Sequence, residues 1–328
     1  MIFPCVVYFL MYQGLGYIIM SKNIFKKIMR EKHPRVSIGL PVYNGGKFLK
    51  ETLDSILIQT FQDFELIISD NASVDDTREI CHAYMMKDRR IRYYRNESNR
   101  GASWNYNYVF QLSVGEYFKW AASDDIFAPE YLHLCVDILD KDPQVVVCYS
   151  KTKIINEHGI IISDYYDGLN LQDETPIKRF IKLIRSIRMC NAVFGLMRAN
   201  VLRKTPLIGN YISSDSCLMA ELSLYGKFFE IPEKLFFRRL HPGASSYDKS
   251  TERQLEFFDP RNKKKIVMPW CRRRYENFVS VKRSQIKLQE KMFLFGFLML
   301  KTLHWYKLYT GEILLATKQF LLKYHKNT

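Results

Sequence analysis

The sequence lacks the short motifs that mark several large classes of nucleotide-binding and metal-binding proteins. No G-x-G-x-x-G follows its first predicted strand and no G-x-x-x-x-G-K-[ST] occurs, so neither a Rossmann-type dinucleotide site nor a P-loop is predicted. The 7 cysteines are scattered, without a C-x-x-C pair or a His/Cys cluster at zinc-ligand spacing. A reduced, cytoplasmic compartment is the simplest interpretation of that pattern.

Acidic residues are comparatively few. The 328 residues include 34 acidic and 49 basic side chains, which gives a formal net charge of +15. A surplus of this size attracts nucleic acid, anionic lipid or phosphate-bearing substrates. The densest basic runs, at residues 21–32 and 261–274, lie outside the segment that holds the acidic motifs. The hydrophobic content of 47% nevertheless fits a globular protein.

Long hydrophobic runs are scarce as well. Residues 1–20 are apolar and nearly long enough for a membrane helix, and basic residues follow them. Three interpretations stay open: a membrane anchor, an interfacial or buried helix, and a start site assigned too early, with Met20 as the true first residue. The longest apolar run towards the other end, residues 292–300 between Lys291 and Lys301, is too short to span a bilayer.

Apolar periodicity predicts an alternation of strands and helices from residue 35 onward. Strands are predicted over residues 35–44, 64–70, 91–96, 115–122 and 145–155, with strand-like residues again at 227–246. Helices are predicted over residues 47–61, 78–88, 101–115, 131–142, 177–190 and 213–226, with an irregular acidic loop at 163–174. This order predicts an α/β fold with a mostly parallel sheet and helices on both faces. The predicted parts are an N-terminal segment (1–34), an α/β domain (35–250) and a basic, aromatic, mostly helical extension (251–328).

Polar side chains follow three of the predicted strands, in PVYN, SDNAS and ASDD. Open parallel sheets bind ligands at the carboxyl ends of their strands. The Asp70 carboxylate can accept a hydrogen bond from a nucleobase, while Asp124 and Asp125 are hard oxygen ligands of the kind that hold Mg²⁺ or Mn²⁺ beside a diphosphate. Any one of these aspartates alone is more often a turn former or a helix cap. Their conjunction at successive strand ends favours a metal-bound nucleotide.

Three segments, in this order, carry a specific resemblance. They are VSIGLPVYNGGKFLKETLDSILIQTFQDFELIISDNASVDDT, IRYYRNESNRGASWNYN and GEYFKWAASDDIFAPEYL. From Val36 to Leu132 the chain resembles the nucleotide-sugar-binding half of family 2 glycosyltransferases, with weaker similarity to about Ser246. The resemblance implies the GT-A fold and an inverting sugar transfer from a nucleotide-sugar donor, with a UDP-sugar expected and no covalent sugar-enzyme intermediate.

The resemblance also implies which residues contact the donor. They are Pro41, Tyr43, Asp70, Asn99, Arg100, Gly101, Ser123 and Arg239. Pro41 and Tyr43 line the base, and Asp70 bonds it. Asn99 and Gly101 begin a helix whose N-terminus suits a phosphate. Arg100 either approaches the diphosphate or faces solvent.

The acidic motif departs from the pattern of the family. In the frequent form L-D-x-D-D the first carboxylate falls where this chain has Ala122. The metal ligand implied by position is then Asp124, with Asp125 as a second ligand or an acceptor-side residue. Ser123 can partly replace the lost carboxylate through its hydroxyl. His241, in FFRRLHPGASS, is implied to contact the metal or the diphosphate, with a simple turn role as the alternative.

The second half of the domain must supply a general base for the acceptor hydroxyl. Asp215, in ISSDSCLMAEL, matches an acidic pair that begins a helix in family members, and its carboxylate can take the acceptor proton. A plain helix-start carboxylate is the alternative. Arg238 or Arg239 is implied to neutralise phosphate charge. The implied cofactor is Mg²⁺ or Mn²⁺, and the implied acceptor is a glycan or lipid-linked molecule in cell-surface polysaccharide or glycoconjugate synthesis.

A second class of function stays open. The basic, aromatic extension can bind nucleic acid or an anionic membrane while the α/β domain is catalytically silent. For a glycosyltransferase the same extension would hold the domain near a lipid-linked acceptor. The expected location is therefore cytoplasmic and peripheral at the cytoplasmic face of the membrane, and nucleic acid is the less favoured partner.

Overall fold

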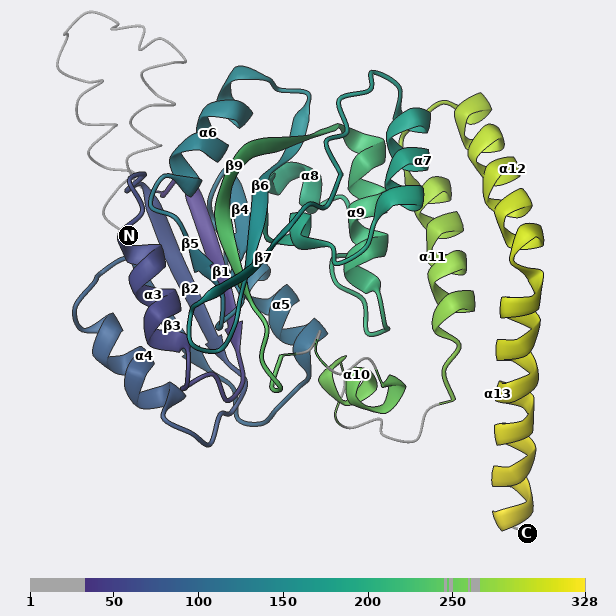
Figure 1. Cartoon of the computed structure of the whole chain (residues 1–328), viewed down its shortest axis with the longest axis horizontal. Coiled ribbons are helices and arrows are strands. Elements are labelled where there is room, and N and C mark those ends of the chain that lie inside the picture. The colour runs from purple at the N-terminus through teal and green to yellow at the C-terminus, as the bar shows by residue number, and fades with distance from the viewer. Residues whose placement is uncertain (1–32, 245–246, 248–249, 259, 261–265, 328) are drawn as a thin grey trace, which may run out of the picture. The chain divides into compact units, whose positions relative to one another are not determined.

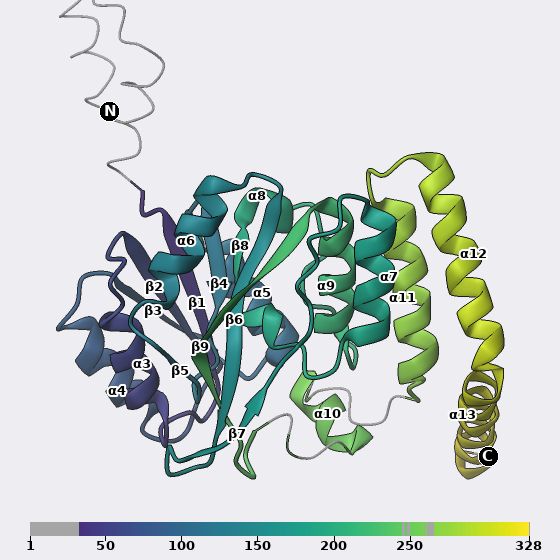
Figure 2. The same cartoon turned by 45° about the horizontal axis from the view of Figure 1, so that its top comes forward.

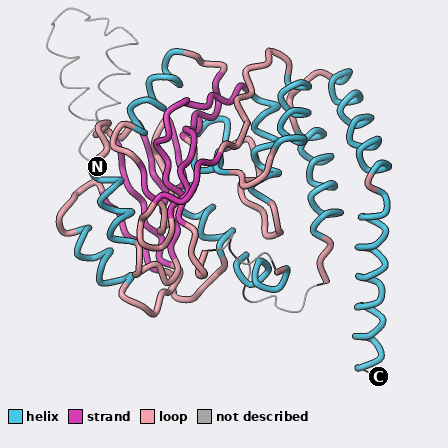
Figure 3. The backbone as a smooth tube through the Cα atoms, viewed as in Figure 1, coloured by secondary structure: helices cyan, strands magenta, loops and turns pink. Residues whose placement is uncertain are grey.

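The computed structural model describes residues 33–244, 247, 250–258, 260 and 266–327, built around one mixed sheet (Figures 1 and 3). Its strands are β1 (Val36–Val42), β2 (Phe64–Asp70), β3 (Ile91–Arg95), β4 (Tyr117–Trp120), β5 (Ile126–Phe127), β6 (Val145–Ile155), β7 (Ile161–Tyr165), β8 (Leu196–Arg198) and β9 (Lys227–Arg239). Its helices are α3 (Leu49–Leu57), α4 (Thr77–Met85), α5 (Ala102–Gln111), α6 (Tyr131–Lys141), α7 (Pro176–Ser186), the 3-10 turn η1 (Asn191–Phe194), α8 (Ala199–Leu202), α9 (Ser214–Tyr225), α10 (Thr251–Phe258), α11 (Pro269–Arg283), α12 (Leu288–His304) and α13 (Tyr306–Asn327). The predictions for residues 1–32 lie outside the described residues.

The sheet is parallel in its first half and mixed in its second. Its strand order is β3-β2-β1-β4-β8-β6-β9-β5, with β7 beside β6. All pairings among β1 to β4 are parallel, as is the pairing of β6 with β9, whereas β8 runs antiparallel to both β4 and β6. The predicted α/β fold is confirmed, and antiparallel strands enter where the chain passes into its second half.

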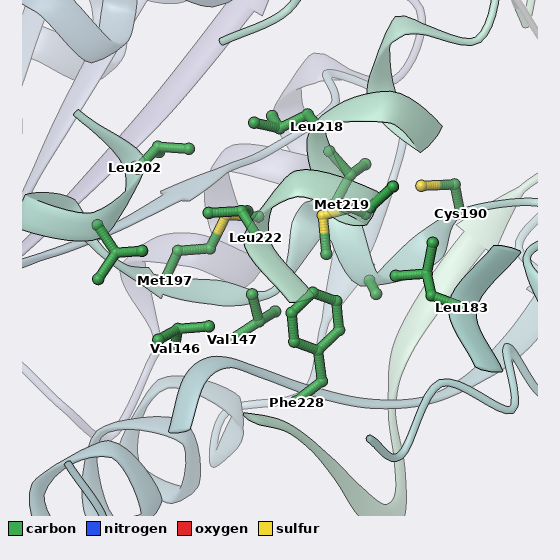
Figure 4. Packing of buried hydrophobic residues seen from close by; sticks show 14 of the residues in the cluster. Val146, Val147, Leu183, Cys190, Met197, Leu202, Leu218, Met219, Leu222 and Phe228 are labelled. Carbon is green, nitrogen blue, oxygen red and sulfur yellow. The ribbon is translucent and has the colours of Figure 1, made fainter. Parts of the chain in front are cut away.

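Helices cover both faces of the sheet, as the sequence predicted (Figure 2). One apolar cluster joins the sheet to α3, α4 and α6 and includes Leu53 and Leu139. The other joins it to α5, α7 and α9 and includes Val147, Leu222 and Phe228 (Figure 4). Every residue of β1 and β2 is buried, which explains why their sequences read as nearly continuous apolar runs.

The C-terminal extension packs onto the same core as the α/β domain. Val281 of α11 and Leu294 and Leu298 of α12 are fully buried in the cluster that includes α9. An ion pair of 2.6 Å between Arg283 and the buried Glu221 ties α11 to α9. Residues 35–328 accordingly form one compact unit. Within the described part of the chain, none of the helices has the length and hydropathy needed to cross a membrane.

Strand β7 occupies part of a stretch that the sequence predicted to be an irregular loop. It pairs antiparallel with β6. Its Asp164 carboxylate accepts a hydrogen bond from Lys234 of β9. Most of β7 is exposed to solvent, although Ile161, Ile162 and Tyr165 are of the types that favour strands. The predicted loop began at residue 163, inside this strand, where the polar Ser163 and Asp164 break the apolar pattern. Backbone pairing with β6, rather than burial, makes this segment a strand.

Strand β4 contains a buried lysine whose replacement should stabilise the fold. Lys119 is 2% exposed, and its Nζ lies 3.5 Å from the centroid of the Phe127 ring. Burial lowers the pKa of Lys119 to about 7. Lys119→Met is therefore expected to raise the free energy of unfolding at pH 7 by about 2–4 kcal/mol, measured by chemical denaturation.

The pH dependence of the Lys119 effect provides the check. Between about pH 7 and the ordinary lysine value of 10.5, the unfolded chain binds a proton that the folded chain has released. Wild-type stability should therefore rise with pH across this window relative to Lys119→Met, and the difference should shrink. Lys50→Met, at an exposed position of α3, should change stability by no more than about 0.5 kcal/mol. A Lys119→Met protein less stable than wild type at pH 7 would contradict the prediction.

Candidate active site

A cavity of about 990 Å³ opens at the carboxyl ends of β1, β2 and β4. Its walls come from residues 41–48 and 122–125, from the end of β9 with the turn that follows, and from α10. Parallel sheets commonly bind ligands at this edge, and the volume suits a ligand of nucleotide-sugar size. The three strand ends that carry the predicted motifs therefore all lie at this cavity.

The loop after β1 forms one wall of the cavity. Pro41 and Tyr43, predicted to contact the base, both line it, and the Tyr43 side chain is 49% exposed. The next residue, Asn44, connects this loop to the one after β2. Its backbone N–H donates to Ser73 Oγ at 2.9 Å, and its Oδ1 accepts from the Val74 N–H at 3.0 Å. These bonds fix the surface on which Pro41 and Tyr43 lie.

Asp70, predicted to bond the base, does not line the cavity in this structure. It is fully buried at the end of β2. Its Oδ1 accepts from the Ser73 N–H at 2.8 Å, and its Oδ2 accepts from the Tyr93 hydroxyl at 2.8 Å, with Arg95 Nε 3.4 Å away. Asn71, the next residue, lines the cavity instead. Asp70 therefore fixes the loop after β2, and its bond to a base stays a prediction.

A network of asparagines stands at the start of α5. The Asn71 amide donates to Asn99 Oδ1 at 2.8 Å, and Asn71 Oδ1 accepts from the Arg100 N–H at 3.0 Å. Gly101, with φ of 85°, turns the chain into the helix in a conformation that disfavours other residues. Asn99 lines the cavity, whereas the exposed Arg100 stacks its guanidinium 3.7 Å from the centroid of the Trp104 ring. Of the two alternatives for Arg100, this structure has the solvent-facing one.

Two of the predicted metal ligands meet in the cavity wall. Asp124 Oδ2 and His241 Nε2 lie 2.9 Å apart, with side chains 24% and 13% exposed. The His241 ring packs against Phe48, with ring centroids 4.6 Å apart, which orients the imidazole. Ala122 and Ser123 also line the cavity. Among the described residues, no third His, Cys, Asp or Glu completes a metal-binding group with them.

Asp125 is placed differently from its neighbour. Its side chain is 3% exposed, and its Oδ1 accepts from the Arg239 backbone N–H at 2.8 Å. Burial, followed by the nearby negative charge of Asp124, raises the pKa of Asp125 to about 8. Asp125 therefore joins the acidic turn to β9, although it also contributes to the cavity wall.

The side chain of Arg239 lines the cavity and also binds protein acceptors. The residue is 1% exposed, and its Nε donates to the Asp124 carbonyl at 2.9 Å. Its Nη1 donates to the Asn156 and Glu157 carbonyls at 3.3 and 3.2 Å, and its Nη2 pairs with Glu51 Oε2 at 2.5 Å. These bonds hold the backbone that carries Asp124, and the neutralisation of phosphate charge by Arg239 stays a prediction.

Asp215, the predicted general base, lies at the start of α9 and is not part of the cavity wall. Its Oδ1 accepts from the Ser216 N–H at 2.7 Å. Burial raises the pKa of Asp215, while the Ser216 bond and the positive charge of Arg238 oppose the rise. Arg238 and Tyr106, which both interact electrostatically with Asp215, do line the cavity. Asp215 therefore lies outside the cavity but within electrostatic range of these two side chains of its wall.

Comparison with known proteins identifies the family. The family model described as glycosyl transferase family 2 matches residues 37–204, about half of the chain. The chain belongs to glycosyltransferase family 2. It is 38% identical over 113 residues to the glycosyltransferase GlyG of Streptococcus pneumoniae serotype 4, an alignment that covers 34% of this chain and 38% of GlyG. The chain therefore spans well under two thirds of that relative.

Solved structures support the fold of this family 2 glycosyltransferase. S. aureus TarS 1–349 in complex with UDP matches with a TM-score of 0.58 and 18% identity, over 78% of this chain and 68% of TarS 1–349. The mannosyltransferase PcManGT of Pyrobaculum calidifontis, in complex with GDP-Man and Mn²⁺, matches with a TM-score of 0.50 and 14% identity, over 88% of this chain and 87% of that one. At these identities the similarity establishes the fold alone.

Several cavity residues of this glycosyltransferase were missed by sequence reasoning. Asn71 adjoins Asp70 in SDNAS and lines the cavity, so the strand-end pattern had identified its loop but not this side chain. Asn105 lines the cavity and bonds Ser69, in the turn of α5 that follows the N-x-G signal. Phe257 of α10 also lines it, and no motif in the sequence points to that helix.

Proposed function

We propose that this family 2 glycosyltransferase moves a sugar from a nucleotide-sugar donor to a hydroxyl of a glycan or lipid-linked acceptor. The proposed setting is cell-surface polysaccharide or glycoconjugate synthesis at the cytoplasmic face of the membrane. One observation carries the proposal. Asp124 and His241, 117 positions apart in sequence, lie 2.9 Å apart in a cavity that Pro41 and Tyr43 also line.

The donor set in the cavity fits a divalent cation held together with a diphosphate. Mg²⁺ and Mn²⁺ are commonly bound by only one or two protein ligands, with substrate phosphates and water completing the shell. Asp124 Oδ2 and His241 Nε2 supply two such ligands. One carboxylate with one imidazole suits Mn²⁺ better than Mg²⁺, which prefers oxygen ligands. When bound, the cation would neutralise charge on the departing nucleoside diphosphate.

The transfer itself is a direct displacement. The acceptor oxygen forms a bond to the anomeric carbon while the bond from that carbon to the diphosphate oxygen breaks, so the configuration inverts. The nucleoside diphosphate leaves with the bonding electron pair. The general base proposed for the acceptor proton is the Asp215 carboxylate, which lies outside the cavity wall, so the acceptor hydroxyl must approach it from beyond the donor cavity. Pro41 and Tyr43 hold the base, and Asn99 at the start of α5 lies beside the diphosphate.

The choice of donor rests on the structural neighbours. TarS 1–349 is in complex with UDP, which supports a UDP-sugar as the donor proposed here. PcManGT is in complex with GDP-Man and Mn²⁺, which supports a divalent cation as the cofactor proposed here.

A panel of nucleotide sugars tests the donor without any acceptor. With Mn²⁺ and UDP-sugar at a hundredfold excess over Kd, thermal unfolding is expected to shift upward by about 5 °C, because a ligand that binds only the folded chain stabilises it. Chelation of Mn²⁺ should remove most of the shift, and a GDP-sugar should give less. Steep salt-dependent retention on DNA with no shift by any nucleotide sugar would favour a catalytically silent binding protein instead.

A further inference from the structure

A second, smaller cavity lies among the helices of the second half of the chain. Helices α7, α9, α11, α12 and α13 contribute to its wall, and Figure 1 shows the first four side by side. Its volume of about 40 Å³ exceeds the roughly 10–15 Å³ that one water molecule needs and suits a single small anion. Of the described residues, none lines both this helix cavity and the donor cavity. The polar side chains in its wall are Ser216, Arg273, Arg274, Asn277, Lys301 and Tyr309.

Three cations in the wall of the helix cavity lack an acidic partner. No carboxylate of the residues that the structure describes lies within ion-pair distance of Arg273, Arg274 or Lys301, whereas the neighbouring Arg272 pairs with Glu276 at 2.6 Å. Burial, followed by the positive charges of nearby arginines, lowers the pKa of Lys301. Burial also lowers the pKa of Arg273, and the charge of Arg274 adds to that effect. Partly buried like charges are costly to hold together, and a bound anion would offset that cost.

Two buried polar atoms of the same wall lack a hydrogen-bond partner in the described ranges. They are Arg274 Nη1 and Asn277 Oδ1, and Asn277 is only 4% exposed. Arg274 is fixed through its Nε, which donates to the Tyr309 hydroxyl at 3.1 Å. A half-turn of the Asn277 amide exchanges its oxygen and nitrogen, so that the side chain can present an N–H. Because an unpaired buried polar group is unfavourable, an anion that bonds both side chains would be favoured here.

The helix cavity adjoins the start of α9, which carries the proposed general base. Ser216 lines the helix cavity, and its N–H donates to Asp215 Oδ1 at 2.7 Å. Arg273 interacts electrostatically with Asp215. Asp215 itself lies outside the wall of the donor cavity. A molecule held in the helix cavity is therefore next to the base without occupying the place of the donor.

We propose that the helix cavity binds a phosphate group, and that in the reaction this group belongs to the acceptor whose hydroxyl approaches Asp215. The planar guanidinium groups of Arg273 and Arg274 match the oxygens of phosphate. Lys301 Nζ donates to the Ile184 carbonyl at 3.4 Å, and its other hydrogens are available to a phosphate oxygen. The assignment to the acceptor rests on the proposed function, whereas the binding of phosphate does not.

Titration calorimetry of the full chain with inorganic phosphate, at constant ionic strength, tests the site. Lys301→Gln is expected to raise the Kd for phosphate at least tenfold, because it removes a charged hydrogen-bond donor. Lys291→Gln is the matched control. Lys291 is also a half-buried residue of α12, and its Nζ also donates to a backbone carbonyl, that of Lys282 at 2.9 Å, but it does not line the helix cavity. This control should bind phosphate as wild type does.

The unfolding temperature separates a binding role of Lys301 from a structural one. Without phosphate, Lys301→Gln should unfold at a temperature no lower than that of Lys291→Gln, because the change removes one of several mutually repelling charges. With phosphate, the wild-type protein and Lys291→Gln should gain more in unfolding temperature than Lys301→Gln does.

Glycerol 3-phosphate distinguishes an acceptor phosphate from free phosphate. If the site serves an acceptor, wild-type protein should bind this phosphate ester, which carries hydroxyls, more tightly than inorganic phosphate. Asp215→Asn should abolish that preference, because the carboxylate that meets the hydroxyl is gone. Equal affinity of the wild-type protein for the two probes would overturn the assignment to the acceptor.

Three results would overturn the phosphate site itself. Lys301→Gln that binds phosphate as tightly as wild type would place the bound phosphate elsewhere, such as in the donor cavity. Lys301→Gln that unfolds well below Lys291→Gln without phosphate would make the lysine a structural residue. Glucuronate that competes as well as phosphate would assign the cations to a carboxylate. None of these measurements contains a nucleotide sugar, so their failure is distinguishable from a failure of donor binding.

Discussion

Replacing Asp124 with asparagine is expected to lower the rate of sugar transfer on the order of 10²- to 10³-fold. The amide preserves the shape of the side chain but removes the negative charge that faces His241 at 2.9 Å. The pair then loses most of its affinity for a hard divalent cation. Initial rates across a Mn²⁺ titration measure the first effect. The Mn²⁺-dependent part of thermal stabilisation by the donor measures the second without relying on turnover.

Asp137→Asn is the matched control for this variant. Asp137 also faces a histidine, His133 at 3.7 Å, but on the outward side of α6 and away from the cavity. Its replacement should leave transfer at the wild-type rate. An Asp124→Asn protein with wild-type rate and unchanged Mn²⁺ dependence would show that the acidic turn does not hold the cation.

The second large effect is expected at Asp215. Asp215→Asn removes a general base and should lower kcat by about 10²- to 10⁴-fold while leaving the KM for the donor nearly unchanged. Glu79→Gln removes an exposed carboxylate from the first turn of α4, as Asp215→Asn does from the first turn of α9, and controls for a helix-dipole effect alone. If Asp215→Asn and Glu79→Gln both change kcat only slightly, Asp215 is not the general base and only stabilises the start of its helix.

The pH profile separates the Asp215 base from its neighbours. A general base acts when ionised, so transfer rises with pH through its pKa. Because burial raises the pKa of Asp215, the acid limb of kcat/KM should lie above the ordinary aspartate range, despite the opposing charge of Arg238. Tyr106 and Cys190 are further titratable groups that interact with Asp215. If the acid limb disappears from the pH profile of the residual activity of Asp215→Asn, the limb belongs to Asp215. If the acid limb is unchanged in that variant, it belongs to another group, such as Asp125.

The pattern of apolar residues in the sequence was enough to predict the strands that are buried on both faces of the sheet. Strands β1 and β2 read as continuous apolar runs because helices cover them above and below. The two-residue strand β5 carries no pattern of its own. It exists because β9 lies alongside it, which is information about the folded chain and not about any local window.

At the site, sequence identified residue types but not their partners. Asp124 and His241 were placed in one site by their motifs, and the structure brings them into contact. Asp70 and Arg239 were assigned to the donor by their positions in the motifs of the family. In the structure their side chains bond groups such as Tyr93 and Glu51, which lie on other elements of the fold. The spacing of residues in the sequence does not predict these hydrogen-bond partners.

The wall of the cavity comes from two parts of the chain, one inside the segment matched by the family model and one after it. The family model ends at residue 204, yet residues 238–244 and α10 complete the wall, with Ser103 of α5 bonded to the Phe258 carbonyl at 3.2 Å. A relative that shares only the matched segment thus shares the part of the wall that residues up to Phe194 supply, and not the part that β9 and α10 supply. Classification by the matched segment therefore compares one part of the pocket and leaves the other out.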